Sequence, residues 1–155
     1  RDGRGRIQGL QIRRDNVQKR KFRWLSSAGR EDGCKAESWS HLAGPVRSKV
    51  ILTEGPMKAD VIFALSGVST VAVPGVNALQ HLKEMLEELQ GQGLCEIKTA
   101  FDMDFLKNEH VKAAYQTLLE LLSEMGFRYG TYLWDDRFKG LDDYLWASIK
   151  GDINN

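Results

Sequence analysis

Cysteine is nearly absent from this chain, which has only Cys34 and Cys95 among 155 residues. Two cysteines far apart in unlike contexts exclude a disulfide framework and a four-ligand zinc site. No apolar run approaches the roughly 20 residues that a membrane-spanning helix needs. The start, Arg1-Asp2-Gly3, has neither an initiator Met nor the apolar core of a signal peptide. We therefore expect a protein of the reducing cytoplasm with no membrane partner, and a piece of a longer chain.

The composition is that of an ordinary globular domain, with 42% hydrophobic and 28% charged residues. The net charge is only +1, but the first 24 residues carry nine Lys or Arg against two Asp. These basic residues are Arg1, Arg4, Arg6, Arg13, Arg14, Lys19, Arg20, Lys21 and Arg23. A basic end on an acid-bearing body indicates binding of a polyanion.

The N-terminal segment reads as a basic β-hairpin. Apolar and basic residues alternate over 7–12 and 21–25, and Asp15-Asn16 between them is a turn candidate. Residues 26–45 are rich in Ser, Gly and charge without a period, which is typical of irregular structure. We expect a boundary near Pro45, with an N-terminal extension over 1–45 and the main domain over 46–155.

After Pro45, strands alternate with helices. The pattern predicts strands at 50–53, 70–73, 96–101 and 128–134, and helices at 57–65, 78–89, 109–125 and 141–147. This alternation indicates βαβ units, hence an α/β domain with a mainly parallel four-stranded sheet flanked by helices.

Two of the predicted strands end on carboxylates: Glu54 after the first, and Asp102 and Asp104 after the third. In a parallel sheet, ligands bind outside the carboxyl ends of the strands, so these acids are expected to converge. Asp102 and Asp104 are two residues apart, so in an extended segment their side chains point to the same side. Clustered carboxylates favour Mg²⁺, or Mn²⁺, and phosphoryl chemistry. Alternatively, Glu54 caps the following helix and the aspartates are solvated loop acids.

Further charged residues could complete such a site. Gly55 lets the chain turn sharply behind Glu54, and Lys58 follows one helical turn later, either to reach a phosphate or to pair with a neighbouring acid. Arg137 and Lys139 could bind phosphate from the far side of the crevice. Asp142 is a candidate metal ligand or simply a helix N-cap.

The hairpin supplies candidates for nucleic-acid binding. Arg13, Arg20 and Arg23 could engage phosphates. Phe22 and Trp24 share one face of their strand and either stack on bases or pack the hairpin onto the main domain. The three histidines are scattered and receive no role.

Three motifs together carry a resemblance to a known family. They are Thr53-Glu54-Gly55 with its following residues, Val73-Pro74-Gly75, and Phe101-Asp102-Met103-Asp104. Over residues 49–146 the chain resembles the Toprim domain of topoisomerases and bacterial-type primases, and in particular the primase-related Toprim proteins of plasmids, phages and integrative elements. The family usually follows its Asp-x-Asp with a small residue and Gly, whereas this chain has Phe105-Leu106-Lys107-Asn108.

The resemblance implies a Toprim, Rossmann-like fold and assigns roles. Glu54 would act as general acid or base, and Asp102 and Asp104 would hold Mg²⁺. Gly75 corresponds to the glycine of the turn after the second strand. Asp142 becomes the candidate third metal acid.

The leading hypothesis is a Mg²⁺-dependent nucleotidyl-transfer module of primase type, acting on a DNA template with nucleoside triphosphates. It would belong to a bacterial, cytoplasmic replication protein of a mobile element. The same acids could instead activate water, as in Toprim nucleases. A third hypothesis is a non-catalytic module that binds nucleic acid or a helicase. A topoisomerase is disfavoured, because all four tyrosines fall within predicted helices or strands.

Overall fold

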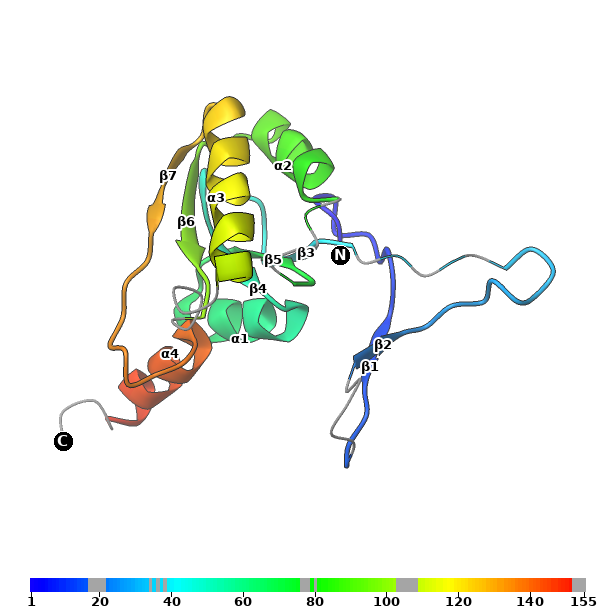
Figure 1. Ribbon diagram of the computed structural model, residues 1–155, viewed down its shortest axis with the longest axis horizontal. Helices are drawn as coiled ribbons and strands as arrows, with labels where there is room; N and C mark the ends of the chain where they lie inside the picture. Colours follow the sequence, from blue (N-terminus) through cyan, green and yellow to red (C-terminus); the bar gives the residue numbers. More distant parts are fainter. Residues whose placement is uncertain are drawn as a thin grey trace.

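A computed structural model describes residues 1–16, 22–33, 35, 37, 39–75, 79, 81–102 and 109–151 (Figure 1). The strands are β1 (Gln11–Arg13), β2 (Phe22–Trp24), β3 (His41–Ala43), β4 (Lys49–Glu54), β5 (Thr70–Val73), β6 (Glu96–Ala100) and β7 (Arg128–Thr131). The helices are α1 (Pro56–Ser66), α2 (Leu82–Gly91), α3 (Glu109–Glu124) and α4 (Leu141–Lys150). In this described part, no helix is long and apolar enough to cross a membrane.

The main sheet has the strand order β3-β5-β4-β6-β7. The strands β5, β4, β6 and β7 run parallel, and β3 joins the edge antiparallel to β5. The α/β class and the mainly parallel sheet are confirmed. The predicted number of four strands is wrong, because the fifth, β3, is a three-residue edge strand without a periodic signal of its own.

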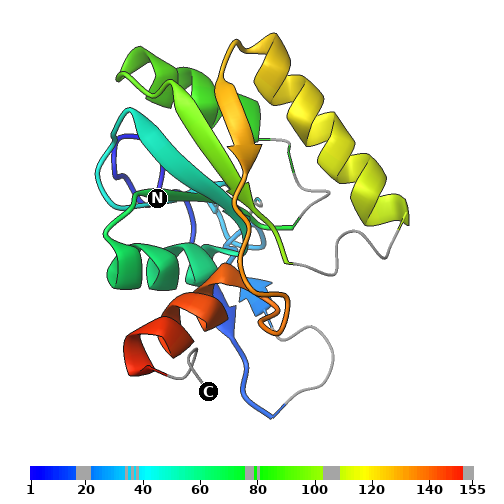
Figure 2. The same cartoon turned by 90° about the vertical axis from the view of Figure 1, so that its left-hand side faces the viewer.

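Helices cover both faces of the sheet, which gives three layers (Figure 2). Val50 and Leu52 of β4 belong to the core cluster beneath α2 and α3. Between them Ile51 points to the opposite face, where it packs in the cluster that holds Ile62 of α1 and Leu141 of α4. Because β4 is buried on both faces, it reads as a continuous apolar run rather than an alternating one.

Several element boundaries differ from the prediction. Helix α2 begins at Leu82 instead of residue 78, and α4 continues to Lys150 instead of ending at 147. Strand β7 ends at Thr131 instead of residue 134. Trp134 is buried in the cluster beneath α1 and α4, and its indole Nε1 donates a 2.9 Å hydrogen bond to the Phe138 carbonyl. A tertiary contact therefore ends the strand early.

The predicted hairpin is present as the antiparallel pair β1 and β2, with Gln11 opposite Trp24 and Arg13 opposite Phe22. Strand β3 lies before Pro45 and is nevertheless paired with β5 of the main sheet. The division of the chain near Pro45 stays a prediction.

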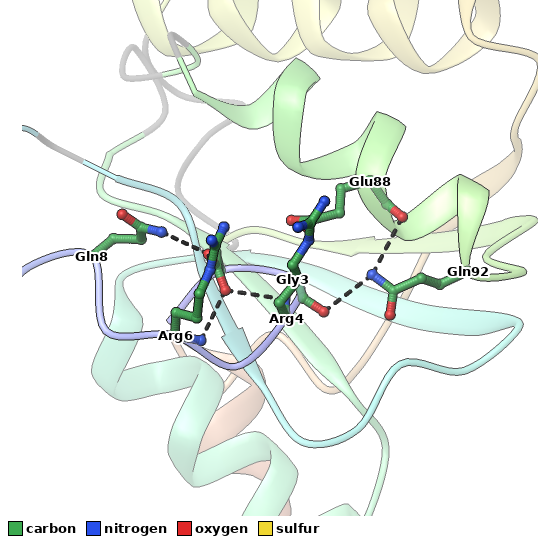
Figure 3. Close-up of polar contacts among 7 residues, drawn as sticks. Gly3, Arg4, Arg6, Gln8, Glu88 and Gln92 are labelled. Carbon is green, nitrogen blue, oxygen red and sulfur yellow. Dashed lines mark hydrogen bonds and ion pairs between the residues drawn. The ribbon is translucent and has the colours of Figure 1, made fainter.

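The first residues dock on α2 through polar contacts (Figure 3). The Asp2 carboxylate accepts four hydrogen bonds of 2.6–3.0 Å from residues 4–8. Arg4 forms an ion pair with Glu88 of α2, and Gln92 Nε2 donates a 3.2 Å hydrogen bond to the Gly3 carbonyl. Burial of Asp2 opposes its ionisation, but the hydrogen bonds outweigh that effect and lower the pKa of Asp2 to about 2.

This pKa predicts a pH-dependent loss of stability in Asp2→Asn. A depressed carboxyl pKa contributes stability above its ordinary value of 3.8, and that stability disappears as the pH falls towards 2. We expect Asp2→Asn to lower the free energy of unfolding at pH 7 by roughly 1–2 kcal/mol. Urea unfolding at pH 7, 4 and 3 should show that the difference in the free energy of unfolding between the variant and the wild type becomes smaller as the pH falls. Substitution of an exposed aspartate, Asp15→Asn, is the control. A gap that does not change with pH would contradict the role given to the Asp2 charge.

Candidate active site

The order of the strands opens a crevice at one point of the sheet. From β4 the chain crosses to β5 on one side, and it later returns to β6 on the other side of β4. At such a switch point the connections leave in opposite directions, which makes the carboxyl ends of β4 and β6 the expected ligand site of a parallel sheet. Glu54 ends β4, and Asp102 lies two residues beyond the end of β6.

The turn after Glu54 depends on glycine. Gly55 has φ of 86°, a backbone conformation that side-chain-bearing residues rarely adopt. Its N–H donates a 2.8 Å hydrogen bond to the Val73 carbonyl, and Pro56 follows as the first helical residue. Gly55 thus converts β4 into α1 within one residue and keeps Glu54, which is partly buried, at the mouth of the crevice.

Two lysines neutralise Asp102. Lys58 Nζ of α1 forms an ion pair with Asp102 Oδ1, and Lys139 Nζ lies 3.6 Å from Asp102 Oδ2. The side chains of Asp102 and Lys58 are 19% and 29% exposed, whereas that of Lys139 is 64% exposed. The Lys58 pair is therefore the better shielded of the two. Of the alternatives for Lys58, the structure shows pairing with an acid, although the acid lies on another element.

Asp142, in the first turn of α4, completes this cluster. Its Oδ1 is buried and has no hydrogen-bond partner among the residues that the structure describes. A Cβ atom placed on Gly140 would overlap Asp142 Oδ1, and it would lie 3.2 Å from Lys58 Nζ and 3.4 Å from Asp102 Oδ1. The bare Cα of Gly140 is thus the point around which all three charged groups gather.

Burial raises the pKa of Asp142 above its ordinary value. The positive charge of Lys58 opposes this shift, whereas the negative charges of Asp143 and Asp102 add to it. A half-buried carboxylate beside a second carboxylate is suited to a cation.

The chemistry of these donors fits Mg²⁺ or Mn²⁺, since both prefer carboxylate oxygens. Among the described residues, no three His, Cys, Asp or Glu side chains are arranged to hold a metal ion by themselves. Asp104, the other acid of the predicted pair, lies outside the described residues.

A cleft of about 330 Å³ lies at the mouth of this site. Its inner wall includes Glu54, Lys58 and Asp102, and its outer wall includes Gln11 and Phe22 of the hairpin. Phe22 is 46% exposed. The hairpin therefore forms one side of the cleft, and Phe22 lines it instead of being buried in the core.

The remaining predicted residues lie in different places. Arg137 binds its neighbour Asp135, with Nη2 2.7 Å from Oδ2, so its guanidinium is engaged within its own loop. Gly75 lies in the turn after β5, while Arg13 and Arg23 are exposed on β1 and β2. Arg20 lies outside the described residues.

Sequence reasoning missed Gln11, Met57 and Gly140 at the site. Gln11 and Met57 line the cleft, and neither carries a pattern in the sequence that marks it for this position. Gly140 stands directly before the predicted helix, between Lys139 and Asp142. Its position beside two charged candidates was the one available signal.

Comparison with known proteins gives one family and one fold. A comparison with curated proteins finds no match. The crystal structure of the Aquifex aeolicus primase (zinc-binding and RNA polymerase domains) is similar, with a TM-score of 0.66 at 16% sequence identity. The match covers 99% of this chain and 37% of the crystallised primase chain, so this chain spans little more than a third of that chain's length. This likeness shows a primase-like fold.

The family is defined by a sequence model that matches residues 38–151. This range includes Glu54, Lys58, Asp102 and Asp142, but not the hairpin of β1 and β2. The chain belongs to the family described as Domain of unknown function (DUF3854).

Proposed function

We propose that the protein is a divalent-metal-dependent nucleotidyl-transfer module of primase type, and that the cleft beside β4 and β6 is its active site. The observation that carries this proposal is the gathering of Lys58, Asp102 and Asp142 around Gly140 at the switch point of the sheet. Paired carboxylates and lysines there suit a metal and a polyphosphate at once. The similarity to a primase fold supports the same reaction class.

In this proposal, Asp102, Asp104 and Asp142 would hold Mg²⁺ or Mn²⁺. A metal ion bound there would neutralise negative charge on the transferred phosphoryl group. Glu54 accepts the proton of the attacking 3′-hydroxyl. Lys58 and Lys139 release Asp102 and bind the substrate phosphates instead, because the phosphates carry more negative charge than one carboxylate.

The nucleic acid would lie between the two walls of the cleft. Phe22 offers an aromatic face on the outer wall. Arg13, Arg20 and Arg23 of the hairpin segment engage phosphates of the DNA template. On the resemblance in sequence, we propose further that the chain serves DNA replication of a plasmid, phage or integrative element, with a helicase as a candidate partner.

Metal binding is the first test. We expect calorimetric titration of Mg²⁺ or Mn²⁺ in the presence of a nucleoside triphosphate to show binding by the wild type. Asp102→Asn combined with Asp104→Asn should weaken it by at least about tenfold, because the hard oxygen ligands are lost. Asp136→Asn, an exposed acid of the neighbouring loop, serves as control. Equal affinity of the double variant and the wild type would rule out a metal at this strand end.

The role of Glu54 is tested by Glu54→Gln. We expect primer synthesis on single-stranded DNA to fall about 10²- to 10⁴-fold, the usual contribution of a general base, while metal affinity stays within a factor of a few. The same assay resolves strand length. Shortened rather than extended strands would support the nuclease alternative, and template binding without any turnover would support a binding module.

Gly140→Ala tests the geometry of the charged cluster. The added methyl group requires Asp142 Oδ1 to move, since the two would overlap. The backbone at Gly140 (φ −116°, ψ 158°) accepts alanine without strain. We expect several-fold weaker metal binding and a loss of about 1 kcal/mol in stability.

Gly91→Ala is the matched control for that variant. A Cβ at Gly91, at the end of α2, would meet no atom of the described residues within 4 Å beyond its chain neighbours and its own helix backbone. Its metal affinity should equal that of the wild type. A Gly140→Ala protein that also binds metal normally would show that the cluster is not the metal site.

A further inference from the structure

A second cavity, of about 180 Å³, adjoins the cleft. Gln11, Pro56 and Met57 line both spaces, so the cavity continues the cleft along α1. Its other walls come from the hairpin region, from residues 39–41 at the start of β3 and from α1. They include Gln8, Trp24, Trp39, His41 and Asp60.

Two indole rings of this cavity are held in place by their neighbours. Trp39 stacks on His81, with ring centroids 3.9 Å apart and an interplanar angle of 22°. Trp24 lies against the backbone at Gly9, where a Cβ would be only 3.1 Å from the Trp24 ring. Rings supported in this way present aromatic surface without first having to be ordered.

Polar groups stand beside the rings. His41 Nε2 lies 2.9 Å from Asp60 Oδ1, and the Asp60 side chain is 63% exposed. Gln8 is oriented by the 2.6 Å hydrogen bond from its Nε2 to Asp2. Burial lowers the pKa of His41 despite the opposing effect of Asp60, which favours the neutral imidazole at pH 7. The cavity therefore combines flat apolar surface with donors and acceptors.

We propose that this cavity binds the base of a nucleotide whose phosphates lie in the adjoining cleft at Lys58 and Lys139. The inference rests on the proposed function for the phosphate end and adds the site of the base. A nucleobase is a flat π-system with a polar edge, and it matches indole faces next to the amide of Gln8 and the exposed carboxylate of Asp60. An aliphatic ligand would contact the indole faces but could form no hydrogen bond with these polar groups.

Tryptophan fluorescence of the 155-residue chain tests the proposal directly. We expect ATP and AMP without metal to quench the emission, because the base stacks on Trp24 and Trp39, and tripolyphosphate to leave it unchanged. Trp39→Leu should weaken AMP binding about tenfold. Trp146→Leu, which removes a 52%-exposed indole on α4, is the matched control and should bind AMP normally.

A second variant guards against loss of folding in Trp39→Leu. Asp60→Asn changes an exposed side chain and replaces a carboxylate, which only accepts hydrogen bonds, by an amide that also donates them. We expect it to change the order of affinity among AMP, GMP, CMP and UMP, because base edges differ in donors and acceptors. An unchanged order would count against the pocket.

The outcomes separate this proposal from the proposed function. Calorimetric binding of tripolyphosphate with Mg²⁺, together with no response to AMP, would overturn the base site and leave the phosphate site standing. Quenching by an oligonucleotide but not by ATP or AMP would overturn the choice of a mononucleotide. Binding of neither tripolyphosphate nor nucleotide would overturn both proposals.

Discussion

Parallel pairing of β4 with β5 on one side and β6 on the other is the constraint on which the rest of the molecule depends. It buries β4 on both faces, and it directs the connections from β4 and β6 away from each other. The space that they leave open lies at the ends where the chain places Glu54 and Asp102. The paired strands fix the positions at which the chain leaves the sheet, and the loops around such a crevice can vary without moving them.

Charge compensation determines how those groups coexist without a ligand. Bringing Asp102 next to the half-buried Asp142 would be costly without cations. Lys58 of α1 and Lys139 of the loop before α4 provide them. In the proposed function, a polyphosphate would replace Asp102 at these lysines. The charged groups would then be in position before the polyphosphate binds, which is the condition for strong electrostatic stabilisation.

Local pattern and strand ends were sufficient to predict the α/β layout and the meeting of Glu54 and Asp102 at one edge of the sheet. Alternating strands and helices, the sharp turn at Gly55 and the shared edge of Glu54 and Asp102 all come from short-range rules. Strand β3 was missed because three residues carry no period, and β7 was predicted too long because Trp134 is drawn into the core. Phe22 and Trp24 line cavities instead of the core. The segment that leads into their hairpin is held by contacts between residues far apart in the sequence, such as Arg4 with Glu88. Periodicity contains no information on such contacts.

The docking of the first residues on α2 has a consequence for the cleft. The hairpin lies between two anchors: residues 1–8, held by Asp2, Glu88 and Gln92, and β3, held in the sheet. The contacts that hold residues 1–8 on α2 are therefore separate from the residues that line the cleft. A substitution at Glu88 or Gln92 would act on this anchor of the hairpin and leave every residue of the cleft lining unchanged.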